Sequence, residues 1–141
     1  MRLAAVAVAL LCACDRDHPV RSCGDDLGGV WRTEAGERWM ILDGGDALEL
    51  YPLFPDVPPS ALEVAPRVID LSRQDGKLAG VVRRRYMHAS DACDATAPVH
   101  VTSCASGTLE LVLADPVPPL GFAPCSWPRP AASRRERWRA E

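Results

Sequence analysis

The residues able to do acid–base or metal chemistry are few and lie far apart in this chain of 141 residues. The three histidines, His18, His88 and His100, match no established metal-ligand or catalytic spacing. The sequence also lacks a Gly-x-Ser-x-Gly nucleophile elbow and a glycine-rich phosphate loop. Carboxylate pairs such as Glu34 and Glu37 lie at predicted hairpin tips, where water keeps both groups ionised. We therefore expect no enzyme activity, no cofactor and no metal.

The sharpest charge feature is the run of three arginines at positions 83–85. In a β-strand Arg83 and Arg85 share one face and Arg84 points to the other. Arg84 is thus a candidate ligand or partner contact inside a barrel or at its mouth, and a solvated strand end is the alternative. The net charge of −3 gives no chain-wide attraction for phosphates, so we expect no nucleic-acid partner.

An apolar run at residues 3–11 precedes the first two of six cysteines. As a helix it would be about 13 Å long, too short to span a bilayer. The junction Leu11-Cys12-Ala13-Cys14 resembles the lipobox of bacterial lipoproteins. That resemblance implies a lipid on the Cys14 sulfur and cleavage before it, in place of an ordinary secretory signal cut after Ala13.

The resulting organisation is a signal peptide over residues 1–13, a tether over 14–26 and one folded domain over 27–141. We expect a membrane partner through the lipid anchor, at the inner or outer membrane of a bacterial cell envelope. The domain then faces an oxidising compartment.

Four cysteines remain in the mature chain, namely Cys23, Cys93, Cys104 and Cys125. An even number in an oxidising compartment predicts two disulfides. In an antiparallel meander, counting strand directions puts Cys23 at the same end as Cys104 and Cys93 at the same end as Cys125. We expect these two pairings, because a bond from Cys93 to Cys104 would have to span the strand between them.

Short apolar runs alternate with turn residues from Leu27 onward, which is typical of an all-β domain. Seven strands are expected, at residues 29–33, 39–42, 47–51, 68–72, 78–82, 99–102 and 108–113. Asp75-Gly76 is the favoured pair for a two-residue hairpin turn. A possible eighth strand at 133–139 would supply the even number that an antiparallel barrel needs to close. The predicted fold is a small up-and-down β-barrel or rolled meander stapled by disulfides.

Two proline-rich connections, residues 52–66 and 115–130, interrupt the strands. They carry apolar side chains, among them Phe54, Phe122 and Trp127, on segments that cannot form long strands. These side chains must cap the core, line a barrel mouth or contact a partner. Direction counting puts the start of both connections at the same end of the barrel.

The triplet Gly29-Val30-Trp31 is similar to the Gly-x-Trp signature that opens the lipocalin barrel. That resemblance implies a tryptophan at the barrel base, close to an arginine beyond the last strand, a role open to Arg134, Arg135 or Arg137.

We expect the domain to bind a small apolar ligand or an envelope protein. Two alternatives are a lipoprotein resembling those that inhibit lysozyme, and an enzyme of unrecognised mechanism built around His88 or His100. An open apolar interior favours the small ligand, whereas a filled core with a protruding segment favours a protein target. The sequence makes no prediction about the oligomeric state.

Overall fold

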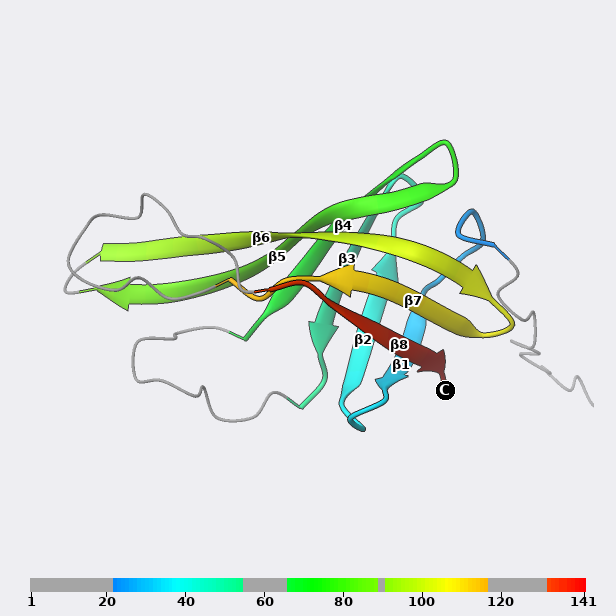
Figure 1. Cartoon of the computed structure of the whole chain (residues 1–141), viewed down its shortest axis with the longest axis horizontal. Helices are drawn as coiled ribbons and strands as arrows, with labels where there is room; N and C mark the ends of the chain where they lie inside the picture. Colours follow the sequence, from blue (N-terminus) through cyan, green and yellow to red (C-terminus); the bar gives the residue numbers. More distant parts are fainter. Residues whose placement is uncertain (1–21, 55–65, 89–90, 117–131) are drawn as a thin grey trace, which may run out of the picture.

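The computed structural model describes residues 22–54, 66–88, 91–116 and 132–141, with the backbone alone at 87, 88 and 91–93. Within these ranges all the regular secondary structure is β-strand. Each strand pairs antiparallel with the next, and the last pairs with the first, so the sheet closes into a barrel (Figure 1). The strands are β1 Gly29–Thr33, β2 Arg38–Asp43, β3 Ala47–Pro52, β4 Val68–Gln74, β5 Lys77–His88, β6 Asp91–Ala105, β7 Thr108–Leu113 and β8 Arg134–Ala140.

The predicted antiparallel barrel is confirmed, and the possible eighth strand exists. β8 joins β7 to β1, with Leu109 opposite Trp138 and Thr33 opposite the same tryptophan. Without this strand the sheet would have two free edges. The C-terminal strand therefore completes the barrel.

Alternation along the strands explains how the barrel interior is filled. On β7 the leucines 109, 111 and 113 are buried while the residues between them are partly exposed, as the period of two requires. Burial of each large side chain stabilises the fold by about 1.5–3 kcal/mol. The core consists of Leu27, Trp31, Trp39, Ile41, Leu48, Leu50, Ile69, Leu71, Leu78, Val82, Val99, Cys104, Leu109, Leu111, Leu113 and Trp138.

The predicted hairpin turn at Asp75-Gly76 is confirmed. Both residues have positive φ, 51° and 71°, which is the geometry of a two-residue turn whose twist matches the flanking strands. Ser106 and Gly107 repeat it between β6 and β7, with φ of 52° and 70°. Glycine takes the second position in both turns because it adopts positive φ at little steric cost.

The hairpin of β5 and β6 is longer than the sequence predicts. Pairing of β5 with β4 ends at Arg83 and pairing of β6 with β7 ends at Val99, so the rest of the hairpin forms a two-stranded arm beyond the barrel (Figure 1). The predicted strand begins at Val99, directly after Pro98, whereas β6 begins at Asp91. In the structure the Pro98 carbonyl accepts from Ala114, so its missing N–H faces the end of the β7 ladder, where it costs little.

The two ends of the barrel differ in the turns and connections that lie there. At one end, the amino rim, β1 begins and tight turns join β2 to β3, β4 to β5 and β6 to β7. At the other, the connection rim, β3 ends at Pro52, β4 begins at Val68, β7 ends at Leu113 and β8 begins at Arg134. Both proline-rich connections therefore start at one end of the barrel, as predicted.

Candidate binding site at the barrel rim

Two tryptophans from different strands stack inside the barrel. The ring centroids of Trp39 on β2 and Trp138 on β8 lie 5.0 Å apart with a tilt of 40°. Each indole N–H donates to the glutamate two positions earlier: Trp39 to Glu37 at 3.3 Å, and Trp138 to Glu136 at 3.0 Å. Residues two apart on a strand share a face, so each glutamate lies on the connection-rim side of its own tryptophan.

Arg67, just before β4, covers the first of these tryptophans. Its guanidinium carbon lies 4.9 Å from the centroid of the Trp39 ring, and one of its nitrogens is 3.5 Å from Glu37. Arg67 also donates to Asp115 at 2.9 Å. This contact ties the residue that follows the first connection to a residue at the start of the second.

Arg134, the first residue of β8, contacts acidic residues at the start of the second connection and on β8 itself. It bonds to Asp115 and lies 2.6 Å from Glu136. Arg84 approaches the same Asp115 at 3.8 Å. We call this set the rim network: Glu37, Trp39, Arg67, Arg84, Asp115, Arg134, Glu136 and Trp138.

Hydrogen bonds from arginines of the rim network keep Asp115 ionised. Burial alone would raise the pKa of Asp115, but hydrogen bonds from Arg134 and Arg67 outweigh it and hold that pKa below its ordinary value. Asp115 therefore stays ionised at neutral pH and cannot act as a general acid. The three arginines balance the three carboxylates, so the network closes the connection rim without excess charge.

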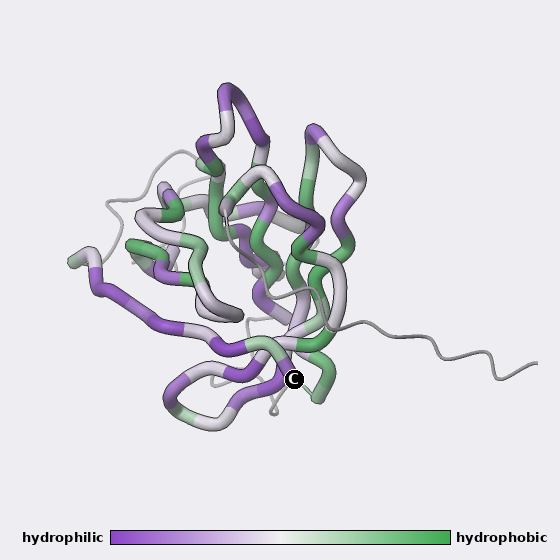
Figure 2. Tube along the Cα trace, turned by 90° about the vertical axis from the view of Figure 1, so that its right-hand side faces the viewer, coloured by the Kyte–Doolittle hydropathy of each residue, from purple (hydrophilic) through white to green (hydrophobic). Residues whose placement is uncertain are grey.

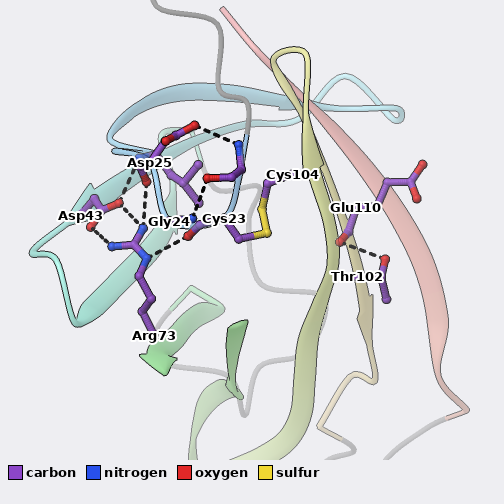
Figure 3. Close-up of a disulfide and its surroundings, with 10 residues drawn as sticks. Cys23, Gly24, Asp25, Asp43, Arg73, Thr102, Cys104 and Glu110 are labelled. Atoms are coloured by element: carbon purple, nitrogen blue, oxygen red, sulfur yellow. Dashed lines mark hydrogen bonds and ion pairs between the residues drawn. A yellow bond between two sulfur atoms is a disulfide. The ribbon is translucent and has the colours of Figure 1, made fainter. Parts of the chain in front are cut away.

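The amino rim is closed by the segment before β1. A disulfide joins Cys23 to Cys104 with their Cα atoms 5.0 Å apart (Figure 3), which confirms the predicted pairing. Leu27 is buried, and its carbonyl accepts the Trp31 indole N–H at 2.8 Å. The last residues of the predicted tether are thus bonded to the barrel beside the turn between β6 and β7.

Arg73 holds this segment from the barrel side (Figure 3). It donates to the carbonyls of Cys23 at 2.9 Å and Asp25 at 3.0 Å, and pairs with Asp43 at 2.7 Å. Asp43 in turn accepts from the Leu27 N–H at 2.9 Å. Burial would raise the Asp43 pKa, but hydrogen bonds from Arg73 and from backbone N–H groups hold it below its ordinary value.

The predicted contact residues that the structure describes lie near the connection rim. Phe54, two residues beyond β3, is 77% exposed. Arg84 turns toward Asp115, while Arg83 and Arg85 pair with Asp70 and Asp94 on the outside, as the strand period predicts. A binding role for Phe54 and Arg84 stays a prediction.

Other predicted residues lie outside the described residues, namely Cys14, Phe122, Cys125 and Trp127. The pairing of Cys93 with Cys125 therefore stays a prediction. Cys93 does not precede the strand that ends near Cys104, as expected, but belongs to it, because β6 begins at Asp91. A bond between Cys93 and Cys104 is incompatible with this extended strand.

Of the three histidines, only His100 has a side chain that the structure describes. His100 is exposed on β6, and His88 belongs to β5 near its end. Across the ranges that the structure describes, no three His, Cys, Asp or Glu side chains come together as a metal site would require. The same ranges contain no helix long and apolar enough to cross a membrane.

Sequence reasoning missed most of the rim network. Its clue is a repeated tripeptide, Glu-Arg-Trp, at residues 37–39 and again at 136–138. In a strand this tripeptide places a carboxylate and an indole on one face with an arginine opposite. Two copies on strands that flank β1 therefore predict a pair of capped tryptophans.

The lipocalin resemblance stays a prediction. β8 pairs with β1, while Arg134 bonds to Asp115 and Arg137 bonds to Glu110 at 2.6 Å. Comparisons with protein-family models, curated proteins and solved structures each find no match to this chain.

Proposed function

We propose that this chain is a lipid-anchored protein of the bacterial envelope whose barrel binds another envelope protein without catalysing a reaction. In this proposal residues 1–13 are the signal peptide, 14–26 the tether and 27–141 the binding domain, with the lipid on Cys14. The observation that supports a protein partner is the filled barrel interior, closed at one rim by the rim network.

A small apolar ligand would need space that the core side chains occupy. An eight-stranded barrel is just wide enough to be filled by side chains or to hold one small ligand. Here Trp31, Trp39 and Trp138 are almost completely buried together with the leucines of β7. Entry through the connection rim would also separate Arg67 and Arg134 from Asp115. Both features favour binding on the outside of the barrel.

The connection rim offers the best surface for a partner in the described residues. Phe54 is exposed there, and so is the side chain of Arg134 at the start of β8 on the same rim. Aromatic and arginine side chains contribute most to the binding energy of protein interfaces. The rim network keeps its arginines fixed before binding, which lowers the entropy cost of an interface.

The arm of β5 and β6 favours one form of this function, inhibition of an envelope hydrolase. It projects past the barrel beyond the pairing limits at Arg83 and Val99 (Figure 1). A rigid projection can enter the cleft of an enzyme, as the resemblance to lysozyme-inhibiting lipoproteins suggested. The exposed pair Arg85–Asp94, at 2.7 Å, joins the two strands of the arm.

A photo-crosslinking residue at position 54 of the full chain, expressed in bacterial cells, tests the proposal. The matched control is position 81, where Val81 is 37% exposed on the outside of β5. We expect one discrete protein adduct from position 54 and none of that mass from position 81. Equal adducts from both positions, or none from position 54, would contradict binding at the connection rim.

A further inference from the structure

The outer face of three neighbouring strands carries five arginines. On β8 the inward side chain is Trp138, so the residues on either side of it point outward; Trp31 on β1 and Trp39 on β2 set the same alternation. Figure 2 shows that the strand leading to the C-terminus is mostly hydrophilic. The outward arginines are Arg32, Arg38, Arg135, Arg137 and Arg139.

Three of these arginines stand in one row across the barrel. Arg139 is opposite Arg32 in the β8–β1 ladder, and Arg32 is opposite Arg38 in the β1–β2 ladder. Neighbouring strands are about 5 Å apart, so the row spans about 10 Å. Like charges directly opposite one another on neighbouring strands are destabilising, so anions beside this row stabilise it.

The protein supplies fewer anions than this face needs. Glu141 bridges Arg32 and Arg38, while Arg137 pairs with Glu110 and lies near Glu34. Among the residues described, no acid lies within ion-pair distance of Arg135 or Arg139. Glu49, opposite Leu42 on the outside of β3, is a fourth glutamate on this face. Five arginines therefore face four glutamates, and the excess of one positive charge lies on the side of Arg135 and Arg139.

An apolar row adjoins the arginine row on the same sheet. Val30 is opposite Met40, and Met40 is opposite Tyr51, all on the outside of β1, β2 and β3. Leu42, two residues further along β2, is 52% exposed. Arginines beside apolar side chains suit a membrane interface, where guanidinium groups bind phosphate and apolar groups reach the acyl boundary.

We infer that this basic face, made of the five arginines with Val30, Met40, Leu42 and Tyr51, docks onto anionic phospholipid headgroups. The inference rests on the proposed lipid anchor at Cys14. The eight residues 14–21 span at most about 28 Å, and the chain enters the barrel at the amino rim beside Cys23. The tether thus holds the barrel close to the membrane, so even weak contacts of this face are made often.

Docking leaves the connection rim pointing sideways along the membrane surface. The barrel then lies on the side formed by β8, β1, β2 and β3, with β5 away from the lipid. Phe54 and the arm remain accessible to a partner that is itself at the membrane.

The test uses the full lipidated chain in vesicles of phosphatidylcholine with 0 or about 30% phosphatidylglycerol, the anionic fraction representing a charged leaflet. A photo-crosslinking residue replaces Leu42, and the control replaces Val81 on the far side. We expect lipid adducts at position 42 in the anionic vesicles, and at least tenfold fewer at position 81. The adducts at position 42 should fall at least tenfold without phosphatidylglycerol.

Variants that change the charge of Arg135 and Arg139 distinguish docking of the basic face from simple proximity to the lipid anchor. Arg135→Gln with Arg139→Gln should reduce lipid adducts at position 42 by about 25-fold, roughly fivefold for each positive charge removed. Arg135→Lys with Arg139→Lys should retain most of them. Circular dichroism checks that each variant keeps the barrel.

Three results would overturn the inference: equal adducts at positions 42 and 81, adducts independent of phosphatidylglycerol, or adducts to a second copy of the chain. Flotation of the vesicles distinguishes this failure from failure of the proposed anchor. A wild-type chain that floats but gives no lipid adduct at position 42 refutes docking alone, whereas a chain that does not float refutes the anchor.

Discussion

Trp39 and Trp138 stack across the barrel with their ring centroids 5.0 Å apart, although they belong to the second and the last strand. This contact joins β8 to β2 past the intervening β1, so it fixes the closure of the barrel as well as filling its interior. Each indole carries its own glutamate, which in turn reaches an arginine of the rim network. One contact thus couples the core to the surface that we propose for binding.

The loss of unfolding free energy in Trp138→Ala and in Phe54→Ala should distinguish a core residue from a surface residue. Trp138 is fully buried and Phe54 is 77% exposed. Trp138→Ala should lower the free energy of unfolding by about 3–5 kcal/mol, whereas Phe54→Ala should change it by about 0.5 kcal/mol or less. Urea unfolding of both variants checks this difference. A Phe54→Ala loss as large as that of Trp138→Ala would mean that Phe54 caps the core and does not await a partner.

Low pH should destabilise the amino rim, because protonation of Asp43 weakens its pairing with Arg73. Its folded-state pKa lies below the ordinary 3.8, so the pairing with Arg73 stabilises the fold fully above about pH 4. This contribution is lost as pH falls through the folded-state pKa, when the carboxylate takes up a proton.

The variant Asp43→Asn should be less stable than the wild type at pH 7, and the gap should shrink below pH 4. Thermal melts from pH 7 to pH 2 measure it. Asp75→Asn, at a turn without an ion pair in the described structure, is the control. A gap that stays constant through the acid range would show that the charge of Asp43 is not the cause.

The disulfide between Cys23 and Cys104 closes a long loop, with 81 residues of sequence separation. Removing both cysteines with Cys23→Ser and Cys104→Ser should cost about 4 kcal/mol, mainly because the unfolded chain gains freedom. Non-reducing peptide mapping should recover Cys23 linked to Cys104 and Cys93 linked to Cys125. A peptide linking Cys93 to Cys104 would contradict the strand β6.

Lipidation predicts a specific N-terminus. Mass spectrometry of the protein purified from membranes should find its first residue to be Cys14, carrying acyl mass on the sulfur. Cys14→Ser should release the protein from the membrane fraction. An unmodified peptide beginning at Cys14 in the wild type would refute the anchor.

The features that the sequence predicted well are mostly those that a few neighbouring residues determine. The alternating leucines of β7 and the Asp75-Gly76 turn each need only a few neighbouring residues to specify a conformation. The pairing of Cys23 with Cys104 is the exception, because it was predicted by counting strand directions between two distant residues.

The features that were missed depend on residues far apart. Arg67 meets Asp115 only because β4 and β7 put their connections at one rim, and neither residue lies in a motif. The arm was missed because residues 91–98 contain alanines and a proline in place of alternating large apolar residues. There the pairing with β5 decides the structure, and intrinsic propensity does not.

The most direct test of a filled barrel that binds on its outer surface is native mass spectrometry of the lipidated chain extracted from its own membranes. We predict the mass of the lipoprotein, alone or with one protein partner that is lost in Phe54→Ala, and no small-molecule adduct. One apolar small molecule per chain, retained after detergent removal and lost when Trp39 is replaced by alanine, would contradict the account.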